Sequence, residues 1–572
     1  MIQHNQFSSR DLNTIRQLTS KEFNPMCHYK PLCRSILLAT FCLFFTLYIE
    51  AQTSAPYVSK VWVSDQGDGT YKNPIINADY SDPDVIRVGN DYYMISSSFN
   101  CVPGIPILHS KDMVNWKLVN YALKRLIPED FFSKPQQGKG VYAPCIRYHK
   151  GEFFIFWPDP DSGIYMTKTK DPLGEWDSSV LVKDGKGLID PTPLWDDDGK
   201  VYLAFAWAKS RAGFNSVITV NELNASANKV IGADVLVYDG LVHGDNIIEG
   251  PKFYKRNGYY YIFAPAGSVE TGWQVILRSK NIYGPYENKI VLAQGKTDIN
   301  GPHQGAWVES PNGESWFFHF QDKGVYGRVV HLQPMKWIYD WPIIGFDSDH
   351  DGCGEPVLTH EKPNVGKTYP LQTVKESDEF EDEKIGIQWQ WPCNPSHFWA
   401  QPSRLGFLRM TAEFTPPDFV NFWSVSNLLL QKIPAEEFSA TTKLEFKSEI
   451  VGEKAGLVVM GRDYATLSLV KTGTGYALEQ SVCIDAEKQN PEKIVKKIDF
   501  ENNQIYLQVQ MKNKGICIFR YSVDGKEYAT LPEIFTARQG KWIGAKVGLF
   551  CVNPLKSGVR GHADVDWFRV DK

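Results

Sequence analysis

The chain has 572 residues, with 61 lysines and arginines against 66 aspartates and glutamates and a formal net charge of −5. A single hydrophobic core stops growing at about 250 to 300 residues, so this length predicts two or three domains. The charge balance argues against a basic face for nucleic acid and indicates a neutral ligand. Aromatic residues make up 13% of the chain, which suits both β-strands and sugar-binding surfaces.

Residues 1–52 are predicted to be a targeting segment. Lys30 and Arg34 precede an apolar run of 14 residues, 36–49, and Ala51 and Gln52 follow it near the expected cleavage point. Basic, apolar and small residues in this order are typical of a secretory signal, and a membrane span needs about 20 residues. Met26 lies closer to the usual distance before such a run, so a true start at Met26 stays open. We therefore expect a periplasmic or secreted protein with no membrane span after cleavage.

Residues 70–357 repeat one phrase five times: a small or acidic residue, usually a proline, an apolar strand, a glycine turn and an aromatic-rich strand. The phrases begin at Asp82-Pro83, Ala143-Pro144, Asp190-Pro191, Glu249-Gly250-Pro251 and Gln304-Gly305. Their turn glycines, at positions 89, 151, 199, 258 and 313, are 62, 48, 59 and 55 residues apart. This period is typical of four-stranded blades, so the segment predicts a five-bladed β-propeller.

Three of the five phrases begin with an acid. Because the head of each first strand should face the central channel, Asp82, Asp190 and Glu249 are expected to converge there. An Asp-Pro pair often only starts a strand or a turn, but Ala143 and Gln304 occupy the equivalent positions elsewhere, so the fold does not require the acid. Hydrolysis of a glycosidic bond with inversion needs one acid for the leaving oxygen and one carboxylate for the water. The three acids are therefore candidate catalytic residues.

The rest of the chain predicts a second all-β domain. Residues 358–376 have little periodicity and are expected to be a linker. Residues 377–572 contain short alternating strands without helices, which predicts a β-sandwich of the concanavalin-like jelly-roll type. The strands expected there are 408–410, 439–446, 456–460, 505–511, 517–521, 545–552 and 563–570. The ten cysteines form no Cys-x-x-Cys pair, which argues against a zinc site or a disulfide framework, although one or two bridges stay open.

From residue 73 to the end, the chain resembles glycoside hydrolase family 43, in its two-domain group of β-xylosidases and α-L-arabinofuranosidases. Three motifs carry the resemblance: residues 73–85 around Asp82-Pro83-Asp84, residues 187–191 around Asp190-Pro191, and residues 248–254 around Glu249-Gly250-Pro251. The resemblance implies that Asp82 is the general base, that Glu249 is the general acid, and that Asp190 orients the acid and tunes its pKa. In relatives, a loop of the second domain also walls off the pocket, which would fit exo action.

The resemblance also implies residues that bind the terminal sugar. Phe99 and Tyr142 correspond to aromatic residues of that subsite, although Tyr142 replaces a tryptophan common in relatives, and Arg328 corresponds to an arginine that bonds sugar hydroxyls. A surface or strand-end salt bridge is the simpler interpretation of Arg328. His303 matches a histidine that often holds a calcium ion through water molecules, so a structural calcium in the channel is implied, against the alternative of an ordinary core histidine. The chemistry itself requires no cofactor.

Three other functions stay open. The invertase and fructanase group shares this layout but needs Asn-Asp-Pro-Asn, Arg-Asp-Pro and Glu-Cys, whereas Ser81 precedes Asp82, Ile189 precedes Asp190 and Gly250 follows Glu249. A catalytically silent, carbohydrate-binding propeller would usually have lost an acid. A family 43 enzyme for another terminal sugar is the third. We expect an inverting, exo-acting enzyme that releases terminal β-D-xylose, α-L-arabinofuranose or both from plant cell-wall oligosaccharides or polysaccharides.

Overall fold

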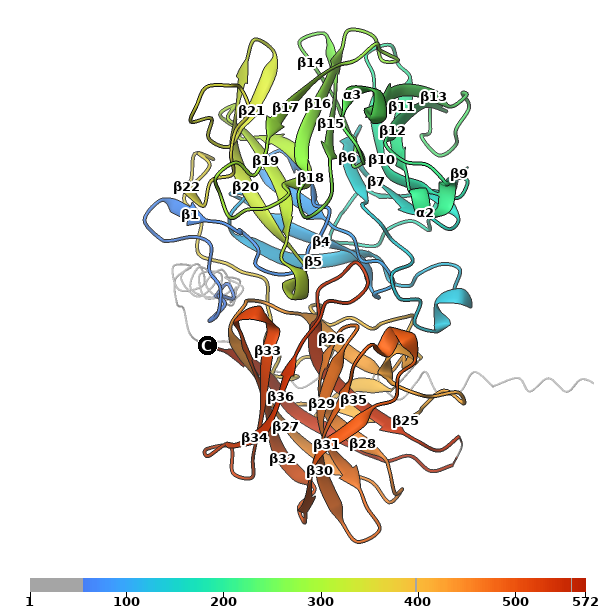
Figure 1. Ribbon diagram of the computed structural model, residues 1–572, viewed down its shortest axis with the longest axis vertical. Coiled ribbons are helices and arrows are strands. Elements are labelled where there is room, and N and C mark those ends of the chain that lie inside the picture. Colours follow the sequence, from blue (N-terminus) through green and yellow to red (C-terminus); the bar gives the residue numbers. More distant parts are fainter. Residues whose placement is uncertain (1–54, 397–398, 557) are drawn as a thin grey trace, which may run out of the picture. The chain divides into compact units, whose positions relative to one another are not determined.

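The computed structural model describes residues 55–396, 399–556 and 558–572. The predicted signal segment lies outside these residues. The described chain is built of β-strands with only short helices (Figure 1), and it consists of a five-bladed propeller followed by a β-sandwich. Within the described ranges, no helix has the length and apolar character needed to cross a membrane.

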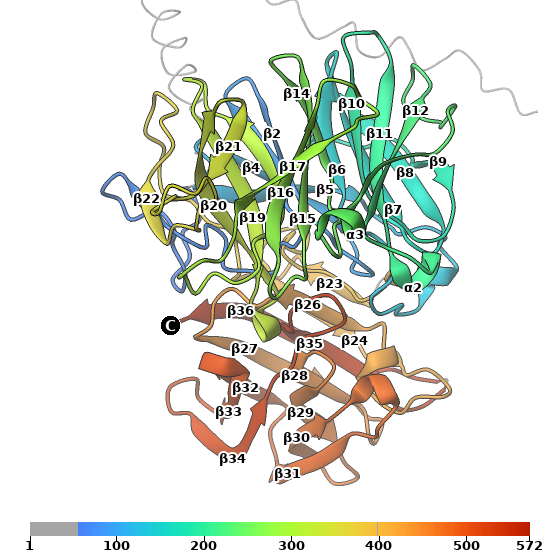
Figure 2. The same cartoon turned by 45° about the horizontal axis from the view of Figure 1, so that its top comes forward.

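Each propeller blade is a sheet of four consecutive strands in chain order (Figure 2). The first strands of four neighbouring pairs of blades contact one another, and between those of the fifth and fourth blades the backbone N–H of Trp307 donates to the Tyr254 hydroxyl, so the first strands form the inner ring of the propeller. The blades are β2 (Asp84–Val88), β3 (Asp91–Ile95), β4 (Gly104–Ser110) and β5 (Trp116–Leu123); β6 (Cys145–His149), β7 (Glu152–Asp159), β8 (Gly163–Thr169) and β9 (Val180–Asp184); β10 (Leu188–Trp195), β11 (Val201–Trp207), β12 (Val217–Leu223) and β13 (Val235–Asp239); β14 (Lys252–Arg256), β15 (Tyr259–Ala266), β16 (Trp273–Ser279) and β17 (Glu287–Leu292); and β18 (His303–Glu309), β19 (Ser315–Asp322), β20 (Arg328–Ile338) and β21 (Trp341–Ile344).

The repeated phrase of the sequence is the inner hairpin of each blade. All five turn glycines have positive φ, from 63° at Gly89 to 87° at Gly151. A Cβ atom added at any of these turns would meet no atom within 4 Å. Glycine is therefore favoured there by the positive φ of the backbone and not by a lack of space for a side chain. The five-bladed propeller predicted from the repeat is confirmed.

The segment before the first blade ties the ring together. The backbone groups of Ile76 and Val330 exchange hydrogen bonds of 3.4 and 3.1 Å, so residues before blade 1 pair with β20 of blade 5. Asn73 adds two more bonds to Leu332, one through its side-chain nitrogen and one through its oxygen. A short pair, β1 (Thr70–Lys72) and β22 (Thr359–Glu361), joins the same segment to the expected linker. The ring is therefore closed by these contacts and not by a shared strand.

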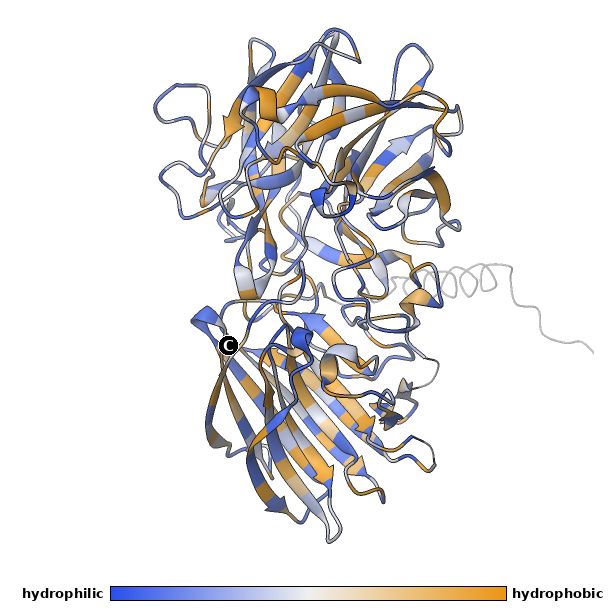
Figure 3. Ribbon diagram, turned by 45° about the vertical axis from the view of Figure 1, so that its right-hand side comes forward, coloured by the Kyte–Doolittle hydropathy of each residue, from blue (hydrophilic) through white to orange (hydrophobic). Residues whose placement is uncertain are grey.

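The C-terminal region is a sandwich of two sheets. The strand orders are β23-β24-β36-β27-β32-β33-β34 in one sheet and β25-β35-β28-β29-β30-β31 in the other, with β26 paired to β35. Along β27 (Phe438–Lys447) buried and more exposed residues alternate from Ala440 on. Figure 3 shows bands of opposite hydropathy along strands of the sandwich. The other strands are β23 (Ala400–Ser403), β24 (Phe407–Thr411), β25 (Glu413–Phe414), β26 (Leu428–Lys432), β28 (Lys454–Met460), β29 (Tyr464–Lys471), β30 (Tyr476–Cys483), β31 (Lys493–Phe500), β32 (Gln504–Lys512), β33 (Ile516–Ser522), β34 (Ala529–Thr536), β35 (Lys546–Asn553) and β36 (His562–Asp571).

Direct hydrogen bonds join the sandwich to the propeller. Val102 and Trp391 exchange backbone bonds of 2.9 and 2.7 Å. The buried Asp79 carboxylate accepts from the backbone N–H of Gly544 at 2.9 Å and from that of Arg328, also at 2.9 Å. One carboxylate thus holds both the loop between β34 and β35 and the start of β20.

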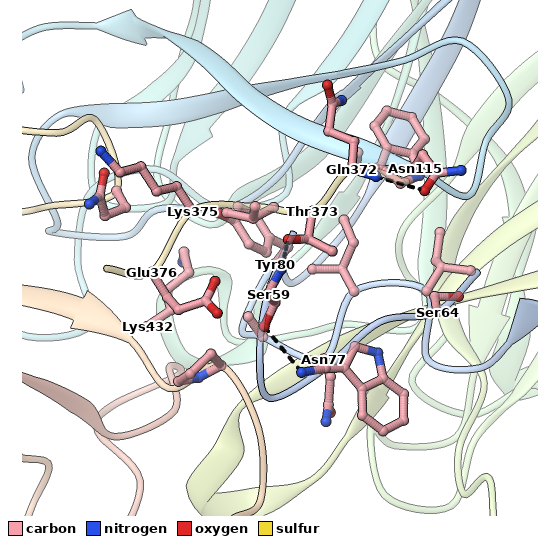
Figure 4. A pocket seen from close by; sticks show the side chains of 18 of the residues that line it. Ser59, Ser64, Asn77, Tyr80, Asn115, Gln372, Thr373, Lys375, Glu376 and Lys432 are labelled. Atoms are coloured by element: carbon pink, nitrogen blue, oxygen red, sulfur yellow. Dashed lines mark hydrogen bonds between the residues drawn. The ribbon is translucent and has the colours of Figure 1, made fainter. Parts of the chain in front are cut away.

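A small hollow of about 60 Å³ lies beside the linker, between blade 1 and the β26 region (Figure 4). The carboxylate of Glu376 points into it near Ser59, with 5% of the residue exposed, and its Oε1 has no hydrogen-bond partner. Burial raises the pKa of Glu376 to about 7. The folded protein therefore holds a proton on Glu376 more tightly than the unfolded chain does.

The raised pKa of Glu376 predicts that the stability of the folded protein depends on pH. A raised carboxyl pKa makes folding less favourable as pH rises from about 4.5 to 7, by up to about 3 kcal/mol. We expect Glu376→Gln to reduce the loss of melting temperature between pH 5 and pH 8, measured by circular dichroism. Glu381→Gln, at an exposed position of the neighbouring segment, removes the same charge and serves as the control. Equal pH dependence in wild type and Glu376→Gln would contradict the prediction.

Candidate active site

The inner strands start from strained backbone positions. φ is 55° at Asp82, 56° at Asp190, 58° at Gly250 and 33° at Gln304. Left-handed φ costs a non-glycine residue about 1 kcal/mol or more and is often retained at functional sites. Four of the five blades therefore share one sharp bend at the head of the inner strand.

These bends bring the three acids into one pocket. The pocket has a volume of about 380 Å³, and Asp82, Asp190 and Glu249 all line it. The other three residues expected to face the sugar, Phe99, Tyr142 and Arg328, line the same pocket. The structure thus brings together residues that are up to 246 positions apart in the chain.

Asp82 is buried and contacts two donors. It is 4% exposed, its Oδ2 accepts a hydrogen bond from the Ser97 hydroxyl, and its Oδ1 lies 3.6 Å from Nη1 of Arg328. The guanidinium of Arg328 also lies 4.9 Å from the centre of the Phe320 ring. Arg328 is therefore buried on the pocket wall and not at the surface. It is also the first residue of β20 and faces Asp322 Oδ2 at 3.7 Å, so the strand-end salt bridge stays open.

Asp190 is linked directly to the chain beside Glu249. The backbone N–H of Gly250 donates to Asp190 Oδ2 at 2.7 Å. Burial raises the pKa of Asp190, while the Gly250 bond opposes that rise, the Asp82 charge adds to it, and Lys252 and Arg328 oppose it. Asp190 therefore fixes the backbone on which Glu249 is carried.

Glu249 is placed to hold a proton. Its side chain is 26% exposed, so it can reach a ligand in the pocket. Burial raises the pKa of Glu249, and the negative charges of Asp190 and then Asp82 raise it further. Such a carboxyl group can donate a proton near neutral pH.

His303 is fully buried beside Glu249. Its Nε2 lies 3.8 Å from Glu249 Oε1, and neither ring nitrogen has a hydrogen-bond partner among the described residues. Burial, with the Arg328 charge, lowers the pKa of His303 to about 3, so the ring is neutral. A neutral ring nitrogen can accept a hydrogen bond from water on a hydrated cation, whereas calcium itself prefers oxygen ligands. The calcium ion thus stays a prediction, held through water if it binds.

Several residues that line the pocket were not predicted from the sequence. Trp542 comes from the sandwich loop between β34 and β35 and is 47% exposed. Lys209 and Arg211 belong to the short helix α2 (Lys209–Ala212), which follows Trp207 at the end of β11. None belongs to the repeated phrase, so no periodic signal marks them.

A second group of polar side chains lies on the inner strands themselves. Asp84, two residues after Asp82, is fully buried and accepts from Arg147 Nη1 at 2.8 Å. Its other oxygen lies 3.9 Å from Lys252 Nζ, which is also buried. Asp84 belongs to the Asp82-Pro83-Asp84 motif, so the sequence carried a signal for Asp84 but none for its partners Arg147 and Lys252.

The acidic turn at residues 347–352 is separate from the pocket. The carboxylates of Asp347, Asp349 and Asp351 offer oxygens within 4.8 Å of one another, and two of these residues are exposed. None of them lines the pocket of the three acids.

All seven described cysteines are free.

Comparisons with known proteins agree with both domains. The model of glycosyl hydrolases family 43 matches residues 71–342, and that of the beta xylosidase C-terminal concanavalin A-like domain matches residues 377–571. A beta-xylosidase of Formosa agariphila is 33% identical, covering 89% of this chain and 91% of that protein. The non-reducing end alpha-L-arabinofuranosidase BoGH43B of Bacteroides ovatus is 31% identical, covering 69% of this chain and 74% of that protein. The crystal structure of the GH43 BlXynB protein of Bacillus licheniformis has a TM-score of 0.75 at 28% identity, covering 88% of this chain and 99% of that one.

Proposed function

Because the chain belongs to glycosyl hydrolase family 43, we propose that it releases terminal β-D-xylose, α-L-arabinofuranose or both from plant cell-wall oligosaccharides, with inversion and from the chain end. The protein is a glycosidase that hydrolyses O-glycosyl bonds. The observation that carries the finer proposal is the convergence of Asp82, Asp190 and Glu249 in one pocket.

The environments of the three acids support an inverting reaction. Glu249, with its raised pKa, donates a proton to the leaving oxygen as the glycosidic bond breaks. Asp82 takes a proton from water on the other face of the sugar, and Arg328 and Ser97 hold its carboxylate in place. Asp190 keeps Glu249 in position through Gly250 and disfavours its ionisation. No step requires a redox cofactor.

The shape and composition of the pocket support exo action on a small terminal sugar. Trp542 narrows the pocket from the sandwich side, and Phe99 and Tyr142 line it from the propeller, with their rings 4.9 Å apart at 75°. Aromatic rings suit the C–H faces of sugars. The relatives include both a beta-xylosidase and an alpha-L-arabinofuranosidase, so both sugars belong in the proposal.

The proposal extends to the location of the enzyme. The apolar run 36–49 after Lys30 and Arg34 supports export to the periplasm or medium, where plant oligosaccharides are met. Mass spectrometry of the N-terminus of the exported protein tests this.

The first experiment combines activity with stereochemistry. We expect the protein to release p-nitrophenol from the β-D-xylopyranoside, the α-L-arabinofuranoside or both, and the first sugar product seen by proton NMR to have the inverted anomeric configuration. Retention of configuration would overturn the roles of Asp82 and Glu249. No release from either substrate, with the protein folded, would leave a silent binding propeller or an enzyme for another terminal sugar.

A further inference from the structure

Four positive residues lie in or next to the pocket of the three acids. Lys209 and Arg211 of α2 line the pocket directly. The side chain of Lys541 packs, with that of Trp542, against Gly138. Lys139 is the next residue in the chain. We call Lys139, Lys209, Arg211 and Lys541 the basic rim.

The basic rim adjoins the aromatic wall of the sugar pocket. The hydroxyl of Tyr142 donates to the Gly138 carbonyl, which places the wall residue Tyr142 beside the loop that meets Lys541. The backbone N–H of Ala208 donates to Gly187 at 2.8 Å, so the residue before α2 is bonded close to the head of β10. The rim is thus held beside the pocket, next to Tyr142 and close to the head of β10.

Negative charge at the rim does not balance the positive charge. Asp161 faces Arg211 Nε at 3.2 Å and Lys139 Nζ at 3.6 Å. Asp159, the next acid along, is buried, and burial raises its pKa. In the part of the chain that the structure describes, no carboxylate oxygen lies within 4.0 Å of Lys209 Nζ or Lys541 Nζ. On the blade 4 side of the mouth the charge is opposite, because Glu270 follows the lining residue Val269.

A neutral sugar forms no ion pair with the basic rim, whereas a carboxylate on the sugar next to the scissile bond would form one. We propose that the aglycone side of the pocket binds a uronic acid substituent, so that the enzyme prefers oligosaccharides whose penultimate sugar carries one. Lys209 offers an exposed ammonium for the carboxylate, and Arg211 adds positive charge beside it, although its Nε faces Asp161 and its Nη1 donates to Ser210. Trp542 offers an apolar face for the ring. This inference rests on the proposed function, since the terminal sugar must occupy the pocket of the three acids.

The test compares two trisaccharides that differ in one carboxyl group. Both have terminal β-xylose on a second xylose; the branch on that second xylose is glucuronic acid in one and its carboxyl-reduced form, glucose, in the other. We expect kcat/KM to be about three- to tenfold higher for the acid form in 50 mM NaCl, the range for a few exposed ion pairs. In 500 mM NaCl the ratio should fall toward one, because salt screens exposed charges.

Substitutions test whether the lysines of the basic rim cause the preference for the acid trisaccharide. The double variant Lys209→Met with Lys541→Met should lower the ratio of the two kcat/KM values at least threefold, whatever happens to each value alone. Lys526→Met, in an exposed turn of the sandwich, removes a lysine away from the rim and should leave the ratio unchanged. A ratio of one or less in wild type at low salt, or an equal ratio in the double variant, overturns the proposal.

A binding measurement separates this inference from the proposed function. If neither trisaccharide is hydrolysed and neither p-nitrophenyl glycoside releases its sugar, the proposed function is wrong. Isothermal titration of both trisaccharides into Glu249→Gln tests the rim without any hydrolysis. Tighter binding of the acid form, lost in 500 mM NaCl, supports the basic rim. Equal affinity overturns it.

Discussion

Replacing Asp82 by asparagine is expected to lower kcat by about 10³-fold or more on every glycoside that the enzyme hydrolyses, because no other carboxylate of the pocket can take the proton from water in its place. Asparagine keeps the shape of the side chain and tolerates the positive φ of 55° at this position. The variant should therefore fold, and its melting temperature checks this. Steady-state rates on p-nitrophenyl glycosides and on xylobiose measure the loss.

Asp322→Asn is the matched control for Asp82→Asn. Asp322 Oδ2 faces the same arginine, at 3.7 Å from Arg328 Nε, but Asp322 does not line the pocket. We expect this variant to lose less than tenfold. If Asp82→Asn kept a tenth of the wild-type rate, or if Asp322→Asn lost as much, the assignment of the base would be wrong.

Replacing Glu249 by glutamine is expected to give a loss that depends on the leaving group. A general acid matters most when the leaving oxygen is a poor leaving group, so kcat/KM on xylobiose should fall by about 10³- to 10⁴-fold. On 2,4-dinitrophenyl β-D-xylopyranoside, whose leaving group departs without a proton, the loss should be tenfold or less. Asp82→Asn, in contrast, should lose activity on both substrates.

The different substrate dependence of Glu249→Gln and Asp82→Asn distinguishes the general acid from the general base. An equal loss on xylobiose and on the dinitrophenyl glycoside in Glu249→Gln would show that Glu249 does not protonate the leaving group. The pH profile is a second readout: the limb of kcat/KM at high pH, which reports loss of the proton from the acid, should disappear in Glu249→Gln on the activated substrate.

Local features of the chain were enough to predict the propeller. Each blade starts with an inner hairpin, and its turn glycine, such as Gly89 or Gly151, adopts a positive φ for reasons that lie within a few residues. The period of the hairpins then fixes the number of blades. Because the repeat places equivalent residues at equivalent points of the ring, Asp82, Asp190 and Glu249 could be assigned to one channel before any distance was known.

The sandwich was predicted less completely. Strands with alternating burial, such as β27 and β32, were expected nearly as found. β29 and β30, whose residues are buried almost throughout, were not named, because such runs lack the period of two that marks a strand with one exposed face. The equally buried β28 and β35 were nevertheless expected, so burial alone does not explain the omission.

Sequence alone therefore determined the class of fold, the family resemblance and the three acids, because repeats, turns and short motifs are local properties of the chain. Only the tertiary structure determined the raised pKa of Glu249, the burial of His303 and the presence of Trp542 and the basic rim at the pocket. The pKa of Glu249 depends on burial and on charges that come from other blades. Trp542 reaches the pocket on a loop held by the bond from Gly544 to Asp79, 465 residues away in the chain, and contacts over such distances leave no periodic mark in the sequence.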